Sequence, residues 1–218
     1  MHYSEVNIKP IERIARVMRH NIHNYLKDAK RGDFLAIGFG WGDELRVAKK
    51  MGFKNIKGVD IDENSVKKLK KEFDVRLYDG KKLPYKDKTF DVVLMNAVLE
   101  HLKNPDEILA EVNRILRKSG EVVIVTPDPS QTYSMFSNFW ADQTHVRPYH
   151  KTAVENMLKT HGFSIKKSYV KVAFLPIFQR IFTSFGLYKA YYGLVWFFNL
   201  FKIGIKEVCV IGVKGEQK

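Results

Sequence analysis

Apolar runs alternate with amphipathic segments along this chain, and this pattern limits the possible folds more than any other feature. Through residue 126, strand-length apolar runs alternate five times with segments whose apolar positions recur at helical spacing. We expect strands at 34–37, 55–60, 75–78, 90–95 and 121–125, and helices at 10–30, 43–51, 63–73 and 105–116. This order predicts an α/β fold with a parallel sheet and helices on both faces. Ligands of such sheets bind beyond the carboxyl ends of the strands.

The rest of the chain extends this sheet and adds one unusual segment. Its expected elements are a helix at 151–160, a sixth strand at 162–172 and a last strand at 206–213. The length predicts a single domain, 1–218, with an N-terminal helical segment at 1–31. An aromatic-rich helical insertion, 173–205, precedes the last strand. It is interpreted as a cap over an apolar substrate, as helices resting on lipid, or as a homodimer surface.

The composition is basic, because 37 Lys and Arg against 24 Asp and Glu give a net charge of +13. Such a balance indicates an anionic partner or a solvated lysine coat. Much of the charge lies in Lys-rich helices and turns such as Lys67-Lys68 and Lys81-Lys82. Nucleic acid is therefore an alternative partner but not the favoured one.

Three observations indicate where the protein resides. The single cysteine, Cys209, excludes an internal disulfide and is expected in the core. The polar first ten residues lack the apolar stretch of a signal peptide. The segment 181–201 is too polar to be favoured as a membrane span. We expect a cytoplasmic protein, with peripheral contact at a membrane as an open alternative.

A glycine-rich turn follows the first expected strand. Gly38, Gly40 and Gly42 lie between this strand and a helix, where glycine permits a sharp turn and close approach of a ligand. The dinucleotide-binding fingerprint requires glycine at the next position, which is Asp43 here. The loop alone is a weak signal for a nucleotide-type ligand.

Two carboxylates make the signal more specific. Asp60 ends the second expected strand, where a carboxylate accepts hydrogen bonds from ribose hydroxyls. Asp79, followed by Gly80, ends the third strand and could accept a hydrogen from an adenine amine. Each aspartate alone is commonly a cap or turn residue. Their occurrence in step with the glycine loop favours a nucleoside-type ligand.

At this point the sequence resembles the class I S-adenosylmethionine-dependent methyltransferases, in particular their small-molecule branch. The resemblance spans residues 33–127, with its motifs in order: Ile37–Gly42, Gly58–Asp62, Asp79–Tyr85, Thr89–Val93, Leu99–Leu102 and Leu116–Glu121. It implies a doubly wound, Rossmann-like sheet of seven mostly parallel strands, with S-adenosyl-L-methionine as cofactor.

The resemblance also implies roles for individual residues. Gly38, Gly40 and Gly42 would surround the amino-acid part of the cofactor, and Asp60 would hold its ribose. Around the adenine would lie Ile61, Asp79 and Gly80, and beside the methionine part Asn96 and Val98. The sequence departs from the family at Ala36, where an acid usually helps to hold the methionine ammonium. Asp43 or Glu44 could replace that acid.

Two segments contain candidate catalytic residues. Methyl transfer from a sulfonium mainly requires alignment, and a base is needed where the acceptor must lose a proton. His101 follows the fourth strand and is either a base or a structural element. His145 and Arg147 follow the fifth strand. His145 is interpreted as a base and Arg147 as the partner of an anionic group. The alternative is that their segment only caps the next helix. No pattern indicates a metal site.

These observations lead to one function and two alternatives. We expect transfer of a methyl group to a hydroxyl or carbon of an apolar, lipid-linked or other small-molecule acceptor. The chain lacks an Asn/Asp-Pro-Pro-Tyr segment and a Pro-Cys nucleophile, which typify amino-group and pyrimidine-carbon methylases. An RNA methyltransferase is the alternative that the charge favours. A non-catalytic protein that binds S-adenosylmethionine is the alternative that Ala36 leaves open.

Overall fold

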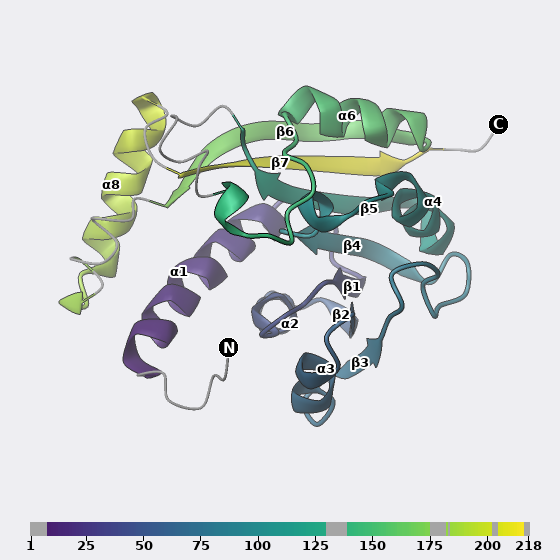
Figure 1. Cartoon of the computed structure of the whole chain (residues 1–218), viewed down its shortest axis with the longest axis horizontal. Helices are drawn as coiled ribbons and strands as arrows, with labels where there is room; N and C mark the ends of the chain where they lie inside the picture. The colour runs from purple at the N-terminus through teal and green to yellow at the C-terminus, as the bar shows by residue number, and fades with distance from the viewer. Residues whose placement is uncertain (1–7, 130–138, 175–181, 183, 202–204, 216–218) are drawn as a thin grey trace.

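A seven-stranded sheet in the order β3-β2-β1-β4-β5-β7-β6 forms the centre of the computed structural model (Figure 1). The structure describes residues 8–129, 139–174, 182, 184–201 and 205–215. The strands are β1 Asp33–Ile37, β2 Lys54–Asp60, β3 Asp74–Leu77, β4 Phe90–Asn96, β5 Leu116–Pro127, β6 Phe163–Phe174 and β7 Ile205–Lys214. The helices are α1 Ile8–Leu26, α2 Asp43–Lys50, α3 Glu63–Leu69, η2 Leu99–His101, α4 Pro105–Ile115, α6 Lys151–Thr160 and α8 Tyr188–Phe201.

The strand directions confirm the expected fold class. Strands β1 to β5 pair in parallel, and β7 runs antiparallel to both β5 and β6. The strand order reverses between β1 and β4, so the loops after these strands diverge and leave room for a ligand. The glycine loop and the segment after β4 both begin at this point.

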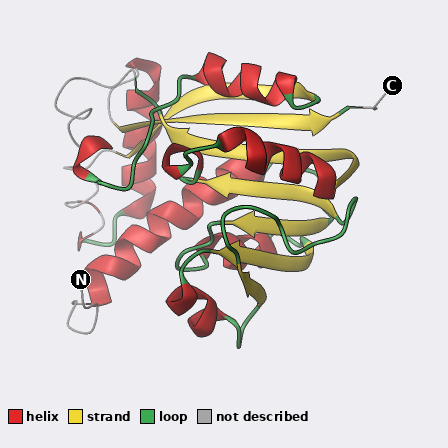
Figure 2. Ribbon diagram, turned by 45° about the vertical axis from the view of Figure 1, so that its right-hand side comes forward, coloured by secondary structure: helices red, strands yellow, loops and turns green. Residues whose placement is uncertain are grey.

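Helices cover the two faces of the sheet (Figure 2). In β4, Val92 and Leu94 pack toward α1, α2 and α3, whereas Val93 and Met95 pack toward α4 and α6. All four side chains are completely buried. A strand with apolar side chains on both faces is stable only between two helical layers. Cys209 is buried in the core, as expected.

Two expected segments near the ends of the chain differ from the observed elements. Strand β6 continues to Phe174, and α8 provides 14 helical residues within the expected insertion 173–205. Residues 175–181, 183 and 202–204 of this insertion, and residues 1–7 of the N-terminal segment, lie outside the described part. Tyr191 of α8 is fully buried against Val17 of α1 and Val172 of β6. Helix α8 is therefore an additional element packed at the β6 edge.

Among the described helices, none has the length and apolar character needed to cross a bilayer.

A buried carboxyl group in β7 makes the stability of the fold depend on pH. Tyr25 of α1 donates a hydrogen bond to Glu207, and burial raises the pKa of Glu207 to about 8. Between the ordinary pKa of a glutamate and this value, the folded chain holds a proton that the unfolded chain has lost. Its contribution is therefore present at low pH and lost as pH rises toward 8, on the order of 5 kcal/mol in total.

We expect Glu207→Gln to gain stability relative to the parent chain as pH rises from 5 to 9, because the amide cannot ionise. Urea unfolding of both proteins at several pH values measures this difference. The other titrating groups are common to the two proteins and cancel in the comparison. A stability difference that does not change with pH would show that Glu207 is not the group responsible.

Candidate functional site

The glycine loop after β1 adopts a backbone that requires glycine. Gly38, Gly40 and Gly42 have φ values of 69°, 44° and 81°, in the left-handed region that other residues rarely adopt. The amide of Gly38 donates a hydrogen bond to the Val59 carbonyl of β2 (2.8 Å), and that of Gly42 donates to the Phe39 carbonyl (2.7 Å). These bonds fix the turn, and α2 begins directly after it.

Close packing also requires glycine at the first position of the loop. A Cβ atom on Gly38 would lie 2.5 Å from Cγ2 of Val98, which follows β4. Gly38 and Val98, two of the predicted cofactor residues, are therefore in contact across the strand-order reversal.

We expect Gly38→Ala to destabilise the loop and to weaken ligand binding. The change combines an unfavourable φ with a steric conflict against Val98, and each costs about 1–2 kcal/mol. Thermal unfolding and calorimetric titration with S-adenosylhomocysteine measure the two effects. Gly52→Ala is the matched control, because Gly52 also has a positive φ (80°) but a Cβ atom there would meet no other atom within 4 Å. Equal effects of the two changes would contradict the importance of the Val98 contact.

Asp60, at the end of β2, ties the loop to the neighbouring turn. One carboxylate oxygen accepts a hydrogen bond from the Gly40 amide (2.8 Å), and the other accepts from the Asp62 amide (3.0 Å). The side chain is buried, and each oxygen retains a lone pair for a ligand hydroxyl. Beside it, Ile61 is 73% exposed and Leu77 is 53% exposed. Uncovered apolar side chains at this place form a surface suited to a flat heterocycle.

Asp79 acts as a turn residue in this structure. One oxygen of its exposed carboxylate accepts hydrogen bonds from the amides of Lys81 and Lys82, which lower the pKa of Asp79. Gly80 has a φ of 82°, as the turn requires. Asp79 therefore makes the hydrogen bonds of a turn residue, and the ligand roles of Asp79 and Gly80 stay predictions.

Ala36 leaves the chain without the family acid, and a buried glutamate lies in the helix that follows the glycine loop. Ala36 is enclosed among apolar side chains on the α1–α3 side of the sheet. Glu44, in the first turn of α2, is buried and accepts a hydrogen bond from the amide nitrogen of Asn96 (2.9 Å). Asp43 instead pairs with Arg19 of α1 (2.9 Å). Of the two acids that could replace the missing one, Glu44 is the one that contacts a predicted cofactor residue.

The environment of Glu44 is unfavourable to its charge. Burial, with smaller contributions from Asp43 and Asp60, raises the pKa of Glu44 to about 7. A cationic ligand group beside it would restore the ionised form.

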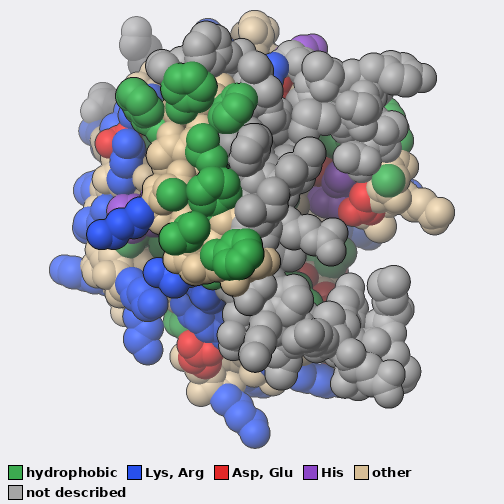
Figure 3. All heavy atoms as spheres, turned by 90° about the vertical axis from the view of Figure 1, so that its left-hand side faces the viewer, with side chains coloured by type: hydrophobic (Ala, Val, Ile, Leu, Met, Phe, Trp, Pro, Cys, Tyr) green, Lys and Arg blue, Asp and Glu red, His purple; other side chains and the backbone are tan. Residues whose placement is uncertain are grey.

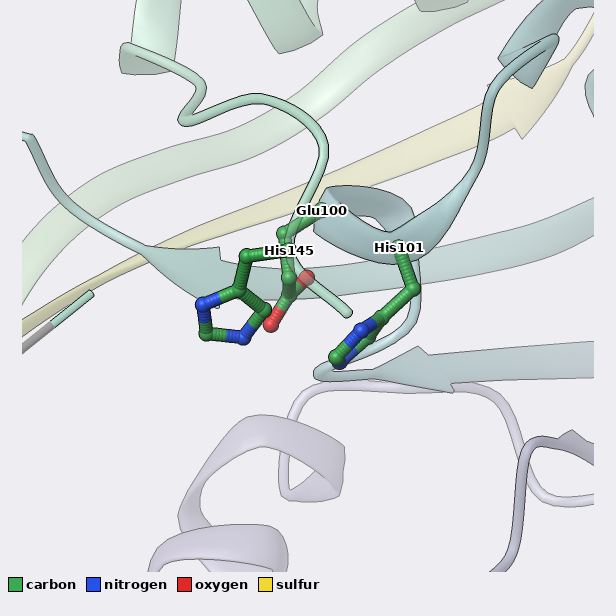
Figure 4. A group of neighbouring side chains, drawn as sticks. All are labelled: Glu100, His101 and His145. Atoms are coloured by element: carbon green, nitrogen blue, oxygen red, sulfur yellow. The ribbon is translucent and has the colours of Figure 1, made fainter. Parts of the chain in front are cut away.

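The two candidate catalytic histidines meet at a third residue, Glu100 (Figure 4). His101 ends η2 after β4, and His145 lies on the segment after β5. Their ring centroids are 4.6 Å apart, and one ligand atom from each of the three side chains lies within 4.8 Å of the others. In the sequence, Glu100 is part of the Leu99–Leu102 motif, and it was not predicted as a site residue. Its burial beside both histidines depends on a contact between segments that are far apart along the chain.

Glu100 is an unusual carboxyl group. The side chain is 1% exposed, and burial raises its pKa to about 7. Its Oε2 accepts a hydrogen bond from the Thr126 hydroxyl of β5 (3.0 Å). Its Oε1 is buried and has no hydrogen-bond partner among the residues that the structure describes. An unsatisfied buried carboxyl oxygen costs free energy, so it indicates a place where a ligand binds.

Backbone hydrogen bonds hold the His145 segment against η2. The amides of Val146 and Arg147 both donate to the carbonyl oxygen of Glu100 (2.8 and 3.3 Å). The Arg147 side chain is exposed, as an anion-binding role requires, but that role stays a prediction. His150, at the start of α6, makes no side-chain capping bond. The segment therefore has a role besides the start of α6, because its hydrogen bonds place His145 next to Glu100.

Comparisons with known proteins identify the family of this chain. A family model described as "Methyltransferase domain" matches residues 11–168. An uncharacterized protein of Methanocaldococcus jannaschii is 30% identical over 169 residues, with 74% of this chain and 78% of that protein covered. A demethylmenaquinone methyltransferase of Lactobacillus johnsonii is 26% identical over 74% of this chain and 80% of its own length. The crystal structure of a SAM-dependent methyltransferase from Archaeoglobus fulgidus superposes with a TM-score of 0.64 at 25% identity, covering 94% of each chain.

Proposed function

Because this chain belongs to the methyltransferase family and is an S-adenosyl-L-methionine-dependent methyltransferase, we propose that it methylates a hydroxyl or carbon of an apolar or lipid-linked acceptor that it meets at a membrane surface.

The described residues fit S-adenosyl-L-methionine. A Cβ atom on Gly40 would meet no other atom within 4 Å, so the loop backbone is open to a ligand at this position. Asp60 offers lone pairs to the ribose, and the uncovered Ile61 and Leu77 offer an apolar surface to the adenine. Glu44 offers the methionine ammonium a carboxyl group that has no cationic partner among the described residues. The bound cofactor supplies an activated methyl group.

The residues of the chain then align the acceptor and hold it where its proton is lost. Val98 packs on Gly38 and continues directly into η2, so the methionine part and the Glu100–His101–His145 cluster are expected to be neighbours. We place the reacting atom of the acceptor between them. Alignment of the two reactants provides most of the rate increase in such a displacement, and the cluster is the place where the acceptor loses its proton.

The observation that supports a lipid-soluble acceptor is an exposed apolar face at α8 (Figure 3). Trp196 and Phe197 are 69% and 47% exposed, and Phe185 and Leu187 just before the helix are 76% and 52% exposed. A contiguous apolar face of this kind marks a site of contact with membrane or protein. The L. johnsonii relative is named for demethylmenaquinone, a quinone, which is consistent with the membrane alternative.

Lys and Arg side chains lie next to this apolar face, to its left and below it in Figure 3. A cavity of about 440 Å³ between α1, β6 and α8 is lined by Trp196, Tyr192, Lys27, Lys167 and Lys171, among others. Aromatic side chains next to lysines suit the interface of a bilayer with anionic headgroups. Of the three interpretations of the insertion, contact with lipid is the one this arrangement favours.

We expect the protein to sediment with vesicles that contain anionic phospholipid and to be released by high salt. The double change Trp196→Ser with Phe197→Ser is expected to reduce vesicle binding by up to about a thousandfold, because roughly 2 kcal/mol is lost for each aromatic side chain that leaves the lipid. Trp41→Ser is the matched control, since Trp41 is 55% exposed but lies under Lys68 of α3. Binding to neutral and anionic vesicles alike, or equal losses in both variants, would contradict the proposal.

The alternative of an RNA methyltransferase is tested alongside the vesicle-binding experiments. Binding to transfer or ribosomal RNA that exceeds vesicle binding and weakens steeply with salt would replace the lipid proposal. A dimer of the chain that is disrupted by the α8 double change, without vesicle binding, would assign the apolar face to self-association.

A further inference from the structure

We propose that Glu100, His101 and His145 form a binding site for a divalent transition-metal ion such as Zn²⁺. The three side chains come from η2 and from the segment after β5, and they converge at the edge of the sheet where the glycine loop lies (Figure 4). Glutamate and histidine are typical ligands of zinc and related ions.

The hydrogen bonds of His145 expose one ring nitrogen to the site. Its Nδ1 lies 2.6 Å from the carbonyl oxygen of Phe139. A carbonyl oxygen only accepts hydrogen bonds, so Nδ1 carries the proton and Nε2 carries the lone pair. The ring also stacks on that of Phe139, with centroids 4.2 Å apart, which fixes its orientation.

His101 is held in the same way. Its Nδ1 lies 2.9 Å from the hydroxyl oxygen of Thr144, and this hydroxyl donates its hydrogen to Asp142 (2.6 Å). Since the hydroxyl has no second hydrogen, it accepts from His101, whose Nε2 is left with the lone pair. Histidines that bind metals are oriented by this kind of hydrogen bond from the second ring nitrogen to an oxygen.

Glu100 supplies the anionic ligand. Its Oε1 is buried with no hydrogen-bond partner in the described part of the chain, whereas Oε2 accepts a hydrogen bond from Thr126. Asp142, whose Oδ2 lies 3.9 Å from Nε2 of His145, adds a second negative charge at the solvent side. One ring nitrogen from each histidine and one carboxyl oxygen lie within 4.8 Å of one another, and such a group of ligand atoms attracts a cation. Metal–ligand bonds of about 2 Å would draw the three side chains closer together.

The role of this ion, unlike its binding, rests on the proposed function. An acceptor hydroxyl bound to the ion would lose its proton to water more readily, because the positive charge stabilises the alkoxide or phenoxide. The oxygen then forms a bond to the methyl carbon of the cofactor, and the carbon–sulfur bond breaks with its electron pair remaining on sulfur. The products are the methyl ether and S-adenosylhomocysteine.

The binding is tested with metal alone, in the absence of cofactor and acceptor. We expect the chelator-treated protein to bind one equivalent of Zn²⁺ by calorimetry and to give the visible absorption of a nitrogen- and oxygen-ligated Co²⁺. His101→Ala and His145→Ala are each expected to weaken binding by at least tenfold, and His150→Ala is the control. His150 lies on the same segment with a side chain 67% exposed, outside the cluster.

Another variant keeps the test valid if substitution of a metal-binding histidine impairs folding. Thr144→Val removes only the oxygen that orients His101, and we expect it to weaken Co²⁺ binding roughly tenfold, as the loss of a hydrogen bond that orients a metal ligand does. Absence of stoichiometric binding, or binding that is unchanged in the His101 and His145 variants, would overturn the site. Zinc binding in a protein that methylates no apolar acceptor would leave the metal site standing and refute the proposed function.

Discussion

Asp60→Ala is expected to lower the affinity for S-adenosylhomocysteine at least a hundredfold, or about 3 kcal/mol. The carboxylate holds the Gly40 amide and the Asp62 amide, and it is the group placed to accept the ribose hydroxyls. The change therefore removes ligand contacts and frees the glycine loop at the same time. Calorimetric titration measures the affinity. The affinity of Asp60→Asn is expected to lie between those of Asp60→Ala and the parent chain, because asparagine retains one acceptor oxygen.

The control for this change is Asp62→Ala, two residues later. Asp62 is exposed and accepts hydrogen bonds from the amides of Asn64 and Ser65 at the start of α3. Its loss is expected to cost about 1 kcal/mol of stability, as for other helix caps, with little effect on the cofactor. If Asp60→Ala binds the ligand within a few-fold of the parent chain, the cofactor is not held as we infer.

Glu44→Gln is expected to weaken cofactor binding by tenfold or more and to remove a pH dependence. With a pKa raised to about 7, Glu44 of the free protein is protonated below neutral pH. The methionine ammonium favours the carboxylate, so affinity should rise with pH through about 7 and level off above it. The cofactor's own ammonium titrates equally in both proteins, and the difference between their titrations isolates Glu44.

Asp43→Asn provides the comparison for Glu44. Asp43 is already paired with Arg19 and contributes to the raised pKa of its neighbour. This variant should retain the pH dependence, with its midpoint moved to lower pH. Identical pH profiles for Glu44→Gln and the parent chain would mean that another group holds the ammonium in place of the acid missing at residue 36.

Much of the fold follows from local patterns in the sequence. Val92, Val93 and Leu94 are apolar in succession because β4 is buried on both faces, and this pattern identifies a parallel strand before any contact is known. The positive φ values of the three loop glycines are also anticipated by residue type. Element ends were predicted less well. Strand β5 begins at Leu116 rather than residue 121, because pairing with β4 extends it beyond its apolar run.

Local sequence was sufficient to predict the sheet, the glycine loop and the aspartate beside it, because each depends on residues that are close along the chain. The acid that lies beside Asn96 could be identified only in three dimensions, since Glu44 accepts the Asn96 hydrogen bond whereas Asp43 pairs with Arg19. The same holds for the meeting of His145 with Glu100 and His101. That contact depends on how the segment after β5 folds back onto η2, and no spacing in the sequence encodes it.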